Sequence, residues 1–240
     1  LLMLPLASLA SGTRRSAAIW IAIVGAVITL SWVFASLAVD LNPPKISPGL
    51  MIALAGGVIS VGALIAIKGA AALAEKIAGP VEKIVILTGR ASLYLVMAMA
   101  LVQFATVILR YVFGLNFIAM QESVTYMHGA VFLLAGGYAF LTDDHVRVDI
   151  FYRDAGPYQK AAVNLAGTYL LLFPFCFVAL WATGPYVANS WAVHEGSMEQ
   201  SGIKGVYLLK SLIAVYLTLL AMAGFVIAAR AAATLKMRSA

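Results

Sequence analysis

The sequence predicts an all-α, polytopic membrane protein with six transmembrane helices and both termini in the cytoplasm. Of its 240 residues, 63% are hydrophobic and only 11% are charged, and the mean hydropathy of +0.97 lies far outside the range of soluble domains. A bilayer core of about 30 Å needs about 20 helical residues. Six separate apolar stretches meet this length.

The six stretches lack the alternation that is typical of a barrel strand, and a helix satisfies every backbone polar group inside lipid. The predicted spans are residues 17–39, 49–67, 84–109, 123–141, 161–183 and 205–229. The predicted domains are an N-terminal tail (1–16), an extra transmembrane hairpin (17–67), a cytoplasmic linker (68–83), a four-helix domain (84–230) and a cytoplasmic tail (231–240). In the linker, Gly79 and Pro80 predict a break. The first tail carries its apolar residues before Arg14 and Arg15, the reverse of a secretory signal, so it is predicted to be interfacial or disordered.

The distribution of positive charge predicts the orientation. These spans place eleven Lys and Arg residues on the side of the N-terminus and four on the other side, which puts both termini in the cytoplasm by the positive-inside rule. Because these charges stand at the ends of apolar stretches, the formal charge of +6 indicates a lipid bilayer as partner and no nucleic acid. The longest external segment, residues 184–205, contains Pro185 and Trp191 and predicts a re-entrant or interfacial element.

Cofactor chemistry finds little support in the residues. The single cysteine, Cys176, excludes an intramolecular disulfide and a thiol cluster. A bis-histidine haem needs two facing histidines, but His145 and His194 are predicted to lie in loops on opposite sides, so neither completes a site with His128. We therefore expect no cofactor, no bound metal and no catalytic residues.

Several residues inside the spans have structural interpretations. Arg90 lies close enough to one end of its span to extend its side chain to the headgroups, and Gln103 is expected to hydrogen-bond a neighbouring helix. Gly136–Gly137 predicts close helix packing, and Pro174 predicts a kink. A free-standing secondary transporter should show paired broken helices around a midplane site, and this sequence has no such pair.

The segment FLTDDHVRVDIFY, residues 140–152, is unusually rich in charge. His145, Arg147 and Asp149 alternate with apolar residues, which predicts an extended segment along the membrane surface or against another protein. Acidic residues here could also serve as metal ligands, but Arg147 in their midst opposes a cation. A solvated turn with ion pairs is the remaining alternative.

Four motifs in order resemble the small membrane (Q-type) subunit of tripartite ATP-independent periplasmic (TRAP) transporters. They are LRYVFG (109–114), Glu122 at the start of the next span, DHVRVD (144–149), and NSWAVHEGSMEQSGIKGVYLLKSLIAVYLTLL (189–220). The resemblance covers residues 84–230. The sequence departs from the family pattern at Gln121, where an acid is usual, and at Lys204, where proline is usual.

The resemblance implies a scaffold in the bacterial inner membrane and not an enzyme. Its implied partners are a large elevator-type membrane subunit and a periplasmic substrate-binding protein, which together perform sodium-coupled uptake of an organic acid or a related solute. The candidate partner-binding residues are Arg110, Tyr111, Glu122, His145, Arg147, Asp149, Glu195, Ser197 and Glu199. The alternative function is a membrane anchor for a cytochrome b-type or other membrane enzyme complex.

Overall fold

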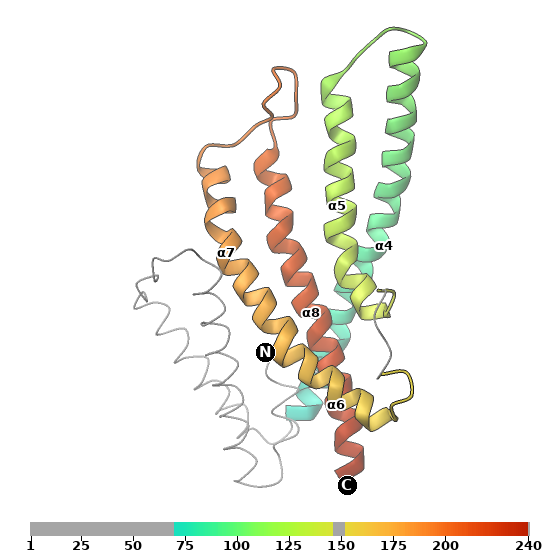
Figure 1. Ribbon diagram of the computed structural model, residues 1–240, viewed down its shortest axis with the longest axis vertical. Helices are drawn as coiled ribbons and strands as arrows, with labels where there is room; N and C mark the ends of the chain where they lie inside the picture. Colours follow the sequence, from blue (N-terminus) through green and yellow to red (C-terminus); the bar gives the residue numbers. More distant parts are fainter. Residues whose placement is uncertain (1–69, 146–151, 240) are drawn as a thin grey trace. The chain divides into compact units, whose positions relative to one another are not determined.

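A computed structural model describes residues 70–145 and 152–239, and the regular secondary structure of this part of the chain is all helical (Figure 1). The elements are α4 (Ala70–Tyr111), α5 (Ile118–Thr142), α6 (Pro157–Gly167), the π-helical segment η1 (Thr168–Leu172), α7 (Phe173–Ala192) and α8 (Val206–Ser239). The predicted hairpin, the first tail, and candidate residues Arg147 and Asp149 lie outside the described residues.

Within residues 70–145 and 152–239, four helical stretches are long and apolar enough to cross a membrane. They are Ala74–Tyr111, Ile118–Thr142, Pro157–Ala192 and Val206–Met237. Each contains, to within one residue, one predicted span of the four-helix domain, so the all-α membrane fold is confirmed over the described residues. The number of spans in the whole chain and the orientation stay predictions.

The chain divides into two compact units, which we describe separately. The first comprises the described residues up to Glu82, His145–Val178 and the residues from Ala221 onward. The second comprises Lys83–Asp144 and Ala179–Leu220.

In the first unit, α4 begins earlier than predicted and continues through Pro80. The predicted break at Gly79–Pro80 is therefore wrong. Ala74 and Ala78, one turn apart, are buried, and Glu82 accepts an ion pair from Arg230 of α8 at 2.7 Å. This packing compensates for the single hydrogen bond that a proline removes from a helix interior.

A π-helical segment, η1, ends two residues before Pro174, where a kink was predicted. Proline cannot donate to the carbonyl of Leu170, four positions earlier, and its ring clashes with that oxygen. The wider π turn is a common way of absorbing such a mismatch. Gly224 of α8 lies against Leu172 here, where a side chain would collide, and the adjacent Phe225 is almost completely buried.

In the second unit, glycines of α5 allow close contact with α8. The contacts pair Gly129 with Leu209, Gly136 with Tyr216 and Gly137 with Leu219. Residue numbers rise together on both helices, so α5 and α8 run parallel, and the first two pairs are seven residues apart, as in a coiled-coil seam. The close packing predicted at Gly136–Gly137 is confirmed.

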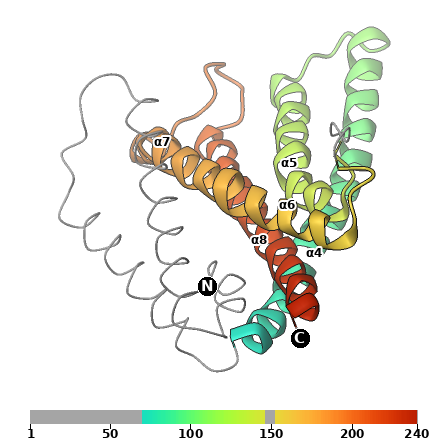
Figure 2. The same ribbon diagram turned by 60° about the horizontal axis from the view of Figure 1, so that its bottom comes forward.

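The other partner of α5 in this unit is α4, which runs beside it in the opposite direction (Figure 2). Gly89 of α4 lies directly against the ring of Tyr138, leaving no room for a side chain. Ser92, one turn further on, is buried and donates to its own helix at Gly89 O, 2.6 Å away.

The segment predicted as a loop at 184–205 is shorter, because α7 continues through Pro185 to Ala192. Prolines are tolerated in transmembrane helices, where the surrounding helix is maintained by the demand for satisfied backbone groups. The last turn of α7 is also held by α8: the indole N–H of Trp191 donates to Ser211 Oγ at 2.7 Å, and its ring meets Tyr207 edge-on at 4.7 Å. The α7–α8 loop is therefore residues 193–205.

Candidate partner-binding surface

The α7–α8 loop begins with a defined helix end. His194 has φ 46°, the left-handed conformation that commonly terminates helices. Its backbone N–H donates to Trp191 O at 3.2 Å, and the next N–H, of Glu195, donates to Ser190 O at 3.0 Å. The imidazole ring of His194 lies 5.8 Å from the ring of Tyr207, so the chain leaves α7 in a fixed direction.

Glu122 of α5 fastens this loop to the neighbouring helix. One carboxylate oxygen accepts from the Ser197 hydroxyl, and the other accepts from the backbone N–H of Ile203 at 2.6 Å. The loop also closes on itself, since Ser197 N–H donates to Ile203 O at 3.1 Å. A Cβ at Gly202 would lie 2.7 Å from the Glu122 carboxylate, which explains a glycine there. The Glu122 carboxylate thus binds the α7–α8 loop at two points, near its beginning and near its end.

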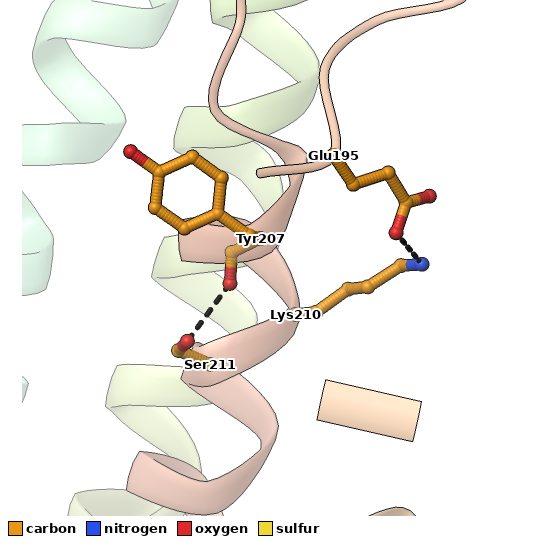
Figure 3. Close-up of polar contacts among 4 residues, drawn as sticks. All are labelled: Glu195, Tyr207, Lys210 and Ser211. Carbon is orange, nitrogen blue, oxygen red and sulfur yellow. Dashed lines mark hydrogen bonds and ion pairs between the residues drawn. The ribbon is translucent and has the colours of Figure 1, made fainter. Parts of the chain in front are cut away.

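A second fastening joins the loop to α8 (Figure 3). Lys210 Nζ lies 2.5 Å from Glu195 Oε2 and 4.1 Å from the centroid of the Tyr186 ring of α7. The hydrogen bond from Lys210 lowers the pKa of Glu195 below its usual value of 4.5. Below the lysine in Figure 3, Ser211 donates its hydroxyl to the carbonyl of Tyr207 at 2.8 Å.

Between these fastenings the loop presents an exposed tip. Met198 is fully exposed, and Glu199, Gln200 and Ser201 are exposed as well. The tip backbone is nevertheless ordered by a hydrogen bond from Glu199 N–H to Ser197 Oγ at 3.1 Å. An exposed methionine beside a carboxylate on a fixed backbone is suited to protein docking.

The α4–α5 connection, residues 112–117, is also apolar and exposed. Arg110 lies in the last turn of α4, where a cation interacts favourably with the helix dipole, and Tyr111 is 79% exposed. Gly114 has φ 67°, a conformation that favours glycine. Gln121, the departure from the family pattern, donates to Asn116 Oδ1 at 2.7 Å and so closes this connection.

At the other end of α5, the helix stops at Asp143, whose φ of 65° is left-handed. Thr142 donates its hydroxyl to the Asp144 carboxylate, and His145 is exposed. The predicted extended segment around Arg147 and Asp149 lies outside the described residues, so this prediction stays open.

The structure thus brings Glu122, Ser197 and Glu195 together at one end of the second unit, and it gives each an internal partner. Sequence analysis did not identify Lys210 or the Ile203 amide as their partners, because no local pattern links residues so far apart. It also missed Tyr126, whose hydroxyl is buried without a hydrogen-bond partner in the described part of the chain. In residues 70–145 and 152–239 we find no cluster of His, Cys, Asp or Glu able to hold a metal.

Comparison with known protein families matched residues 99–236 to the DctQ component of the tripartite ATP-independent periplasmic transporters. The chain belongs to this family. A search of curated proteins and a search of solved structures each gave no match. The DctQ component is the small membrane subunit of a TRAP transporter and not an enzyme, which decides against a cytochrome b-type anchor. The protein is therefore a multi-pass inner membrane protein of a transport system.

Proposed function

We propose that this chain is the fixed scaffold of its transporter, holding a large elevator-type subunit in the bilayer during sodium-coupled uptake of an organic acid or a related solute. The tripartite family implies such a large membrane subunit and a periplasmic binding protein. A scaffold must resist sliding, which broad helix packing with a few anchored polar contacts provides.

The behaviour of the hydroxyl groups in the spans carries this proposal. Seven of these hydroxyls in the described residues donate to carbonyls three or four positions earlier in their own helices, namely those of Thr88, Ser92, Thr106, Ser123, Thr168, Thr183 and Thr218. A transporter site instead directs polar groups toward a shared cavity near the midplane. The described helices carry no converging polar set, so cargo passage falls to another subunit.

The scaffold is proposed to have six spans with both termini in the cytoplasm, on the basis of the Lys and Arg distribution. This orientation places the α7–α8 loop in the periplasm. The extra hairpin at 17–67 would add lipid-facing area or contact another copy of the chain. Cysteine-accessibility labelling of Met198→Cys in a Cys176→Ser background, from each side of the membrane, tests the orientation.

The tip of the α7–α8 loop is our proposed docking surface for the periplasmic binding protein. Met198 and Glu199 are exposed, while Glu195 is already committed to Lys210. Charge reversal at Glu195 would therefore disrupt the loop, and Glu199→Lys is the cleaner test. We expect a two- to about fivefold change in binding-protein affinity, with a changed salt dependence. Gln200→Lys is the control for added charge, and unchanged affinity in Glu199→Lys would remove the loop from the docking surface.

On the opposite side, His145, Arg147 and Asp149 are proposed to form a cytoplasmic clasp with the large subunit. Arg147 or His145 would meet a partner carboxylate or helix C-terminus, and Asp149 a partner cation or helix N-terminus. The double variant His145→Ala/Asp149→Ala should lower co-purification of the large subunit by about fivefold, as expected for partly exposed contacts. Full assembly and uptake in this variant would exclude the clasp.

A further inference from the structure

One face of α5 carries two polar side chains that the rest of the second unit leaves exposed. Thr125 and His128 are exposed, and Phe132 on the same face is 72% exposed. Their spacing of three and four residues places them in one stripe along the helix. The remaining flanks of α5 are occupied, by α8 at Gly136 and by α4 at Tyr138.

Gln103 of α4 lies at the same level as this stripe. At about 1.5 Å per residue, Gln103 is about 10 Å from Arg110, and His128 is about 9 Å from Glu122. The contact of Gly89 with Tyr138 sets the antiparallel register of α4 and α5, and counting from it brings Gln103 level with the start of the stripe at Thr125.

These positions lie inside candidate membrane spans, where polar groups without partners are unfavourable. Gln103 is exposed, and in the described part of the chain its amide makes no hydrogen bond. The His128 ring lies 5.7 Å from the ring of Phe132, measured between centroids. The α4 side chains Leu93, Met97 and Leu101, each more than 60% exposed and spaced four residues apart, form by contrast an apolar stripe. The chain therefore has a face suited to lipid and a different face that is not.

We propose that the α5 stripe (Thr125, His128 and Phe132) together with Gln103 is the membrane-embedded contact with the large subunit. The occupant is a transmembrane helix of that subunit that offers hydrogen-bonding side chains at the level of Gln103 and His128. The predicted spans of the chain's own hairpin, 17–67, contain no charged, amide or imidazole side chain and offer only hydroxyl and indole groups, so a helix of another subunit is the better source of partners for an amide and an imidazole. The inference rests on the proposed scaffold function and names the surface through which it acts.

Photo-crosslinking in native membranes tests which molecule covers this face. The photoreactive residue p-benzoylphenylalanine replaces Phe132 in one variant and, as a control on the lipid-facing side, Leu101 in another. We expect illumination to join position 132 to a peptide of the large subunit, identified by mass spectrometry, and position 101 to yield no protein adduct. An adduct of position 132 with a second copy, with the hairpin, or with lipid alone overturns the proposal.

A double substitution tests the polar groups themselves. Gln103→Leu/His128→Leu removes both hydrogen-bonding groups while suiting lipid better, so the chain should still insert and elute as a single species. The co-purified large subunit should fall about tenfold, from two intramembrane hydrogen bonds, whereas Leu101→Phe should leave it unchanged. Full recovery of the large subunit in the double variant overturns the inference and leaves the scaffold function intact. Absence of the large subunit from the wild-type preparation overturns the scaffold function itself.

Discussion

The contact of Gly137 in α5 with the backbone of α8 gives a quantitative prediction. A Cβ at Gly137 would lie 3.0 Å from the carbonyl carbon, carbonyl oxygen and Cβ of Leu219, whereas nonbonded carbons prefer about 3.5–4.0 Å. In Gly137→Ala the new methyl group must therefore displace the backbone at Leu219. Overpacking of this kind lowers the free energy of unfolding by about 1–3 kcal/mol. The alanine also gains about 1 kcal/mol of helix propensity over glycine, which offsets part of that cost.

The variant Gly167→Ala separates the cost of overpacking from the gain in helix propensity. A Cβ at Gly167 meets nothing within 4 Å, and its φ of −60° and ψ of −40° are helical, so only the propensity gain remains. The two variants should differ by about 1–3 kcal/mol, or about 2–12 °C in melting temperature for a chain of this size.

The assay is thermal unfolding of both purified variants in one detergent at one scan rate, because such unfolding is often irreversible. Gly137→Ala is expected to melt below Gly167→Ala. Equal or reversed melting temperatures would refute the close approach of α5 and α8.

Three further outcomes follow from the loop and the core. Glu122→Ala should speed tryptic cleavage at Lys204, because the carboxylate that accepts from both ends of the α7–α8 loop is lost; an unchanged cleavage rate would show that the loop is held otherwise. Because its pKa is lowered, Glu195 stabilises the folded chain above its usual pKa of 4.5, and this stabilisation is lost as pH falls through the folded-state value. The melting-temperature difference between wild type and Glu195→Gln, which lacks the ion pair to Lys210, should therefore narrow below pH 4.5 and not above it. Cys176 is 3% exposed and should react with a water-soluble maleimide only after denaturation.

Composition predicted the helical spans because length and continuous hydrophobicity are local properties of a sequence. The break expected at Pro80 was wrong, and α7 continues past the expected span end at Thr183. Proline acts locally, while packing and the demand for satisfied backbone groups act over the whole helix. Near Pro174 the helix does depart from regular α geometry, in the π-helical segment η1.

The candidate surface could be predicted only in part. The motifs identified Glu122, Glu195 and Ser197, yet the contact between Glu122 and Ser197 joins residues 75 positions apart, a distance that no periodicity reveals. Gln103 was expected to hydrogen-bond a neighbouring helix, and no such hydrogen bond is present within the described residues. The absence of this hydrogen bond is one reason why we propose a helix of the large subunit as the partner of Gln103.

The most direct test of the scaffold account is solute uptake by reconstituted components under a sodium gradient. The purified chain alone in proteoliposomes should accumulate no organic acid, while the chain together with the large subunit and the binding protein should do so. Sodium-dependent accumulation by the isolated chain would contradict the account.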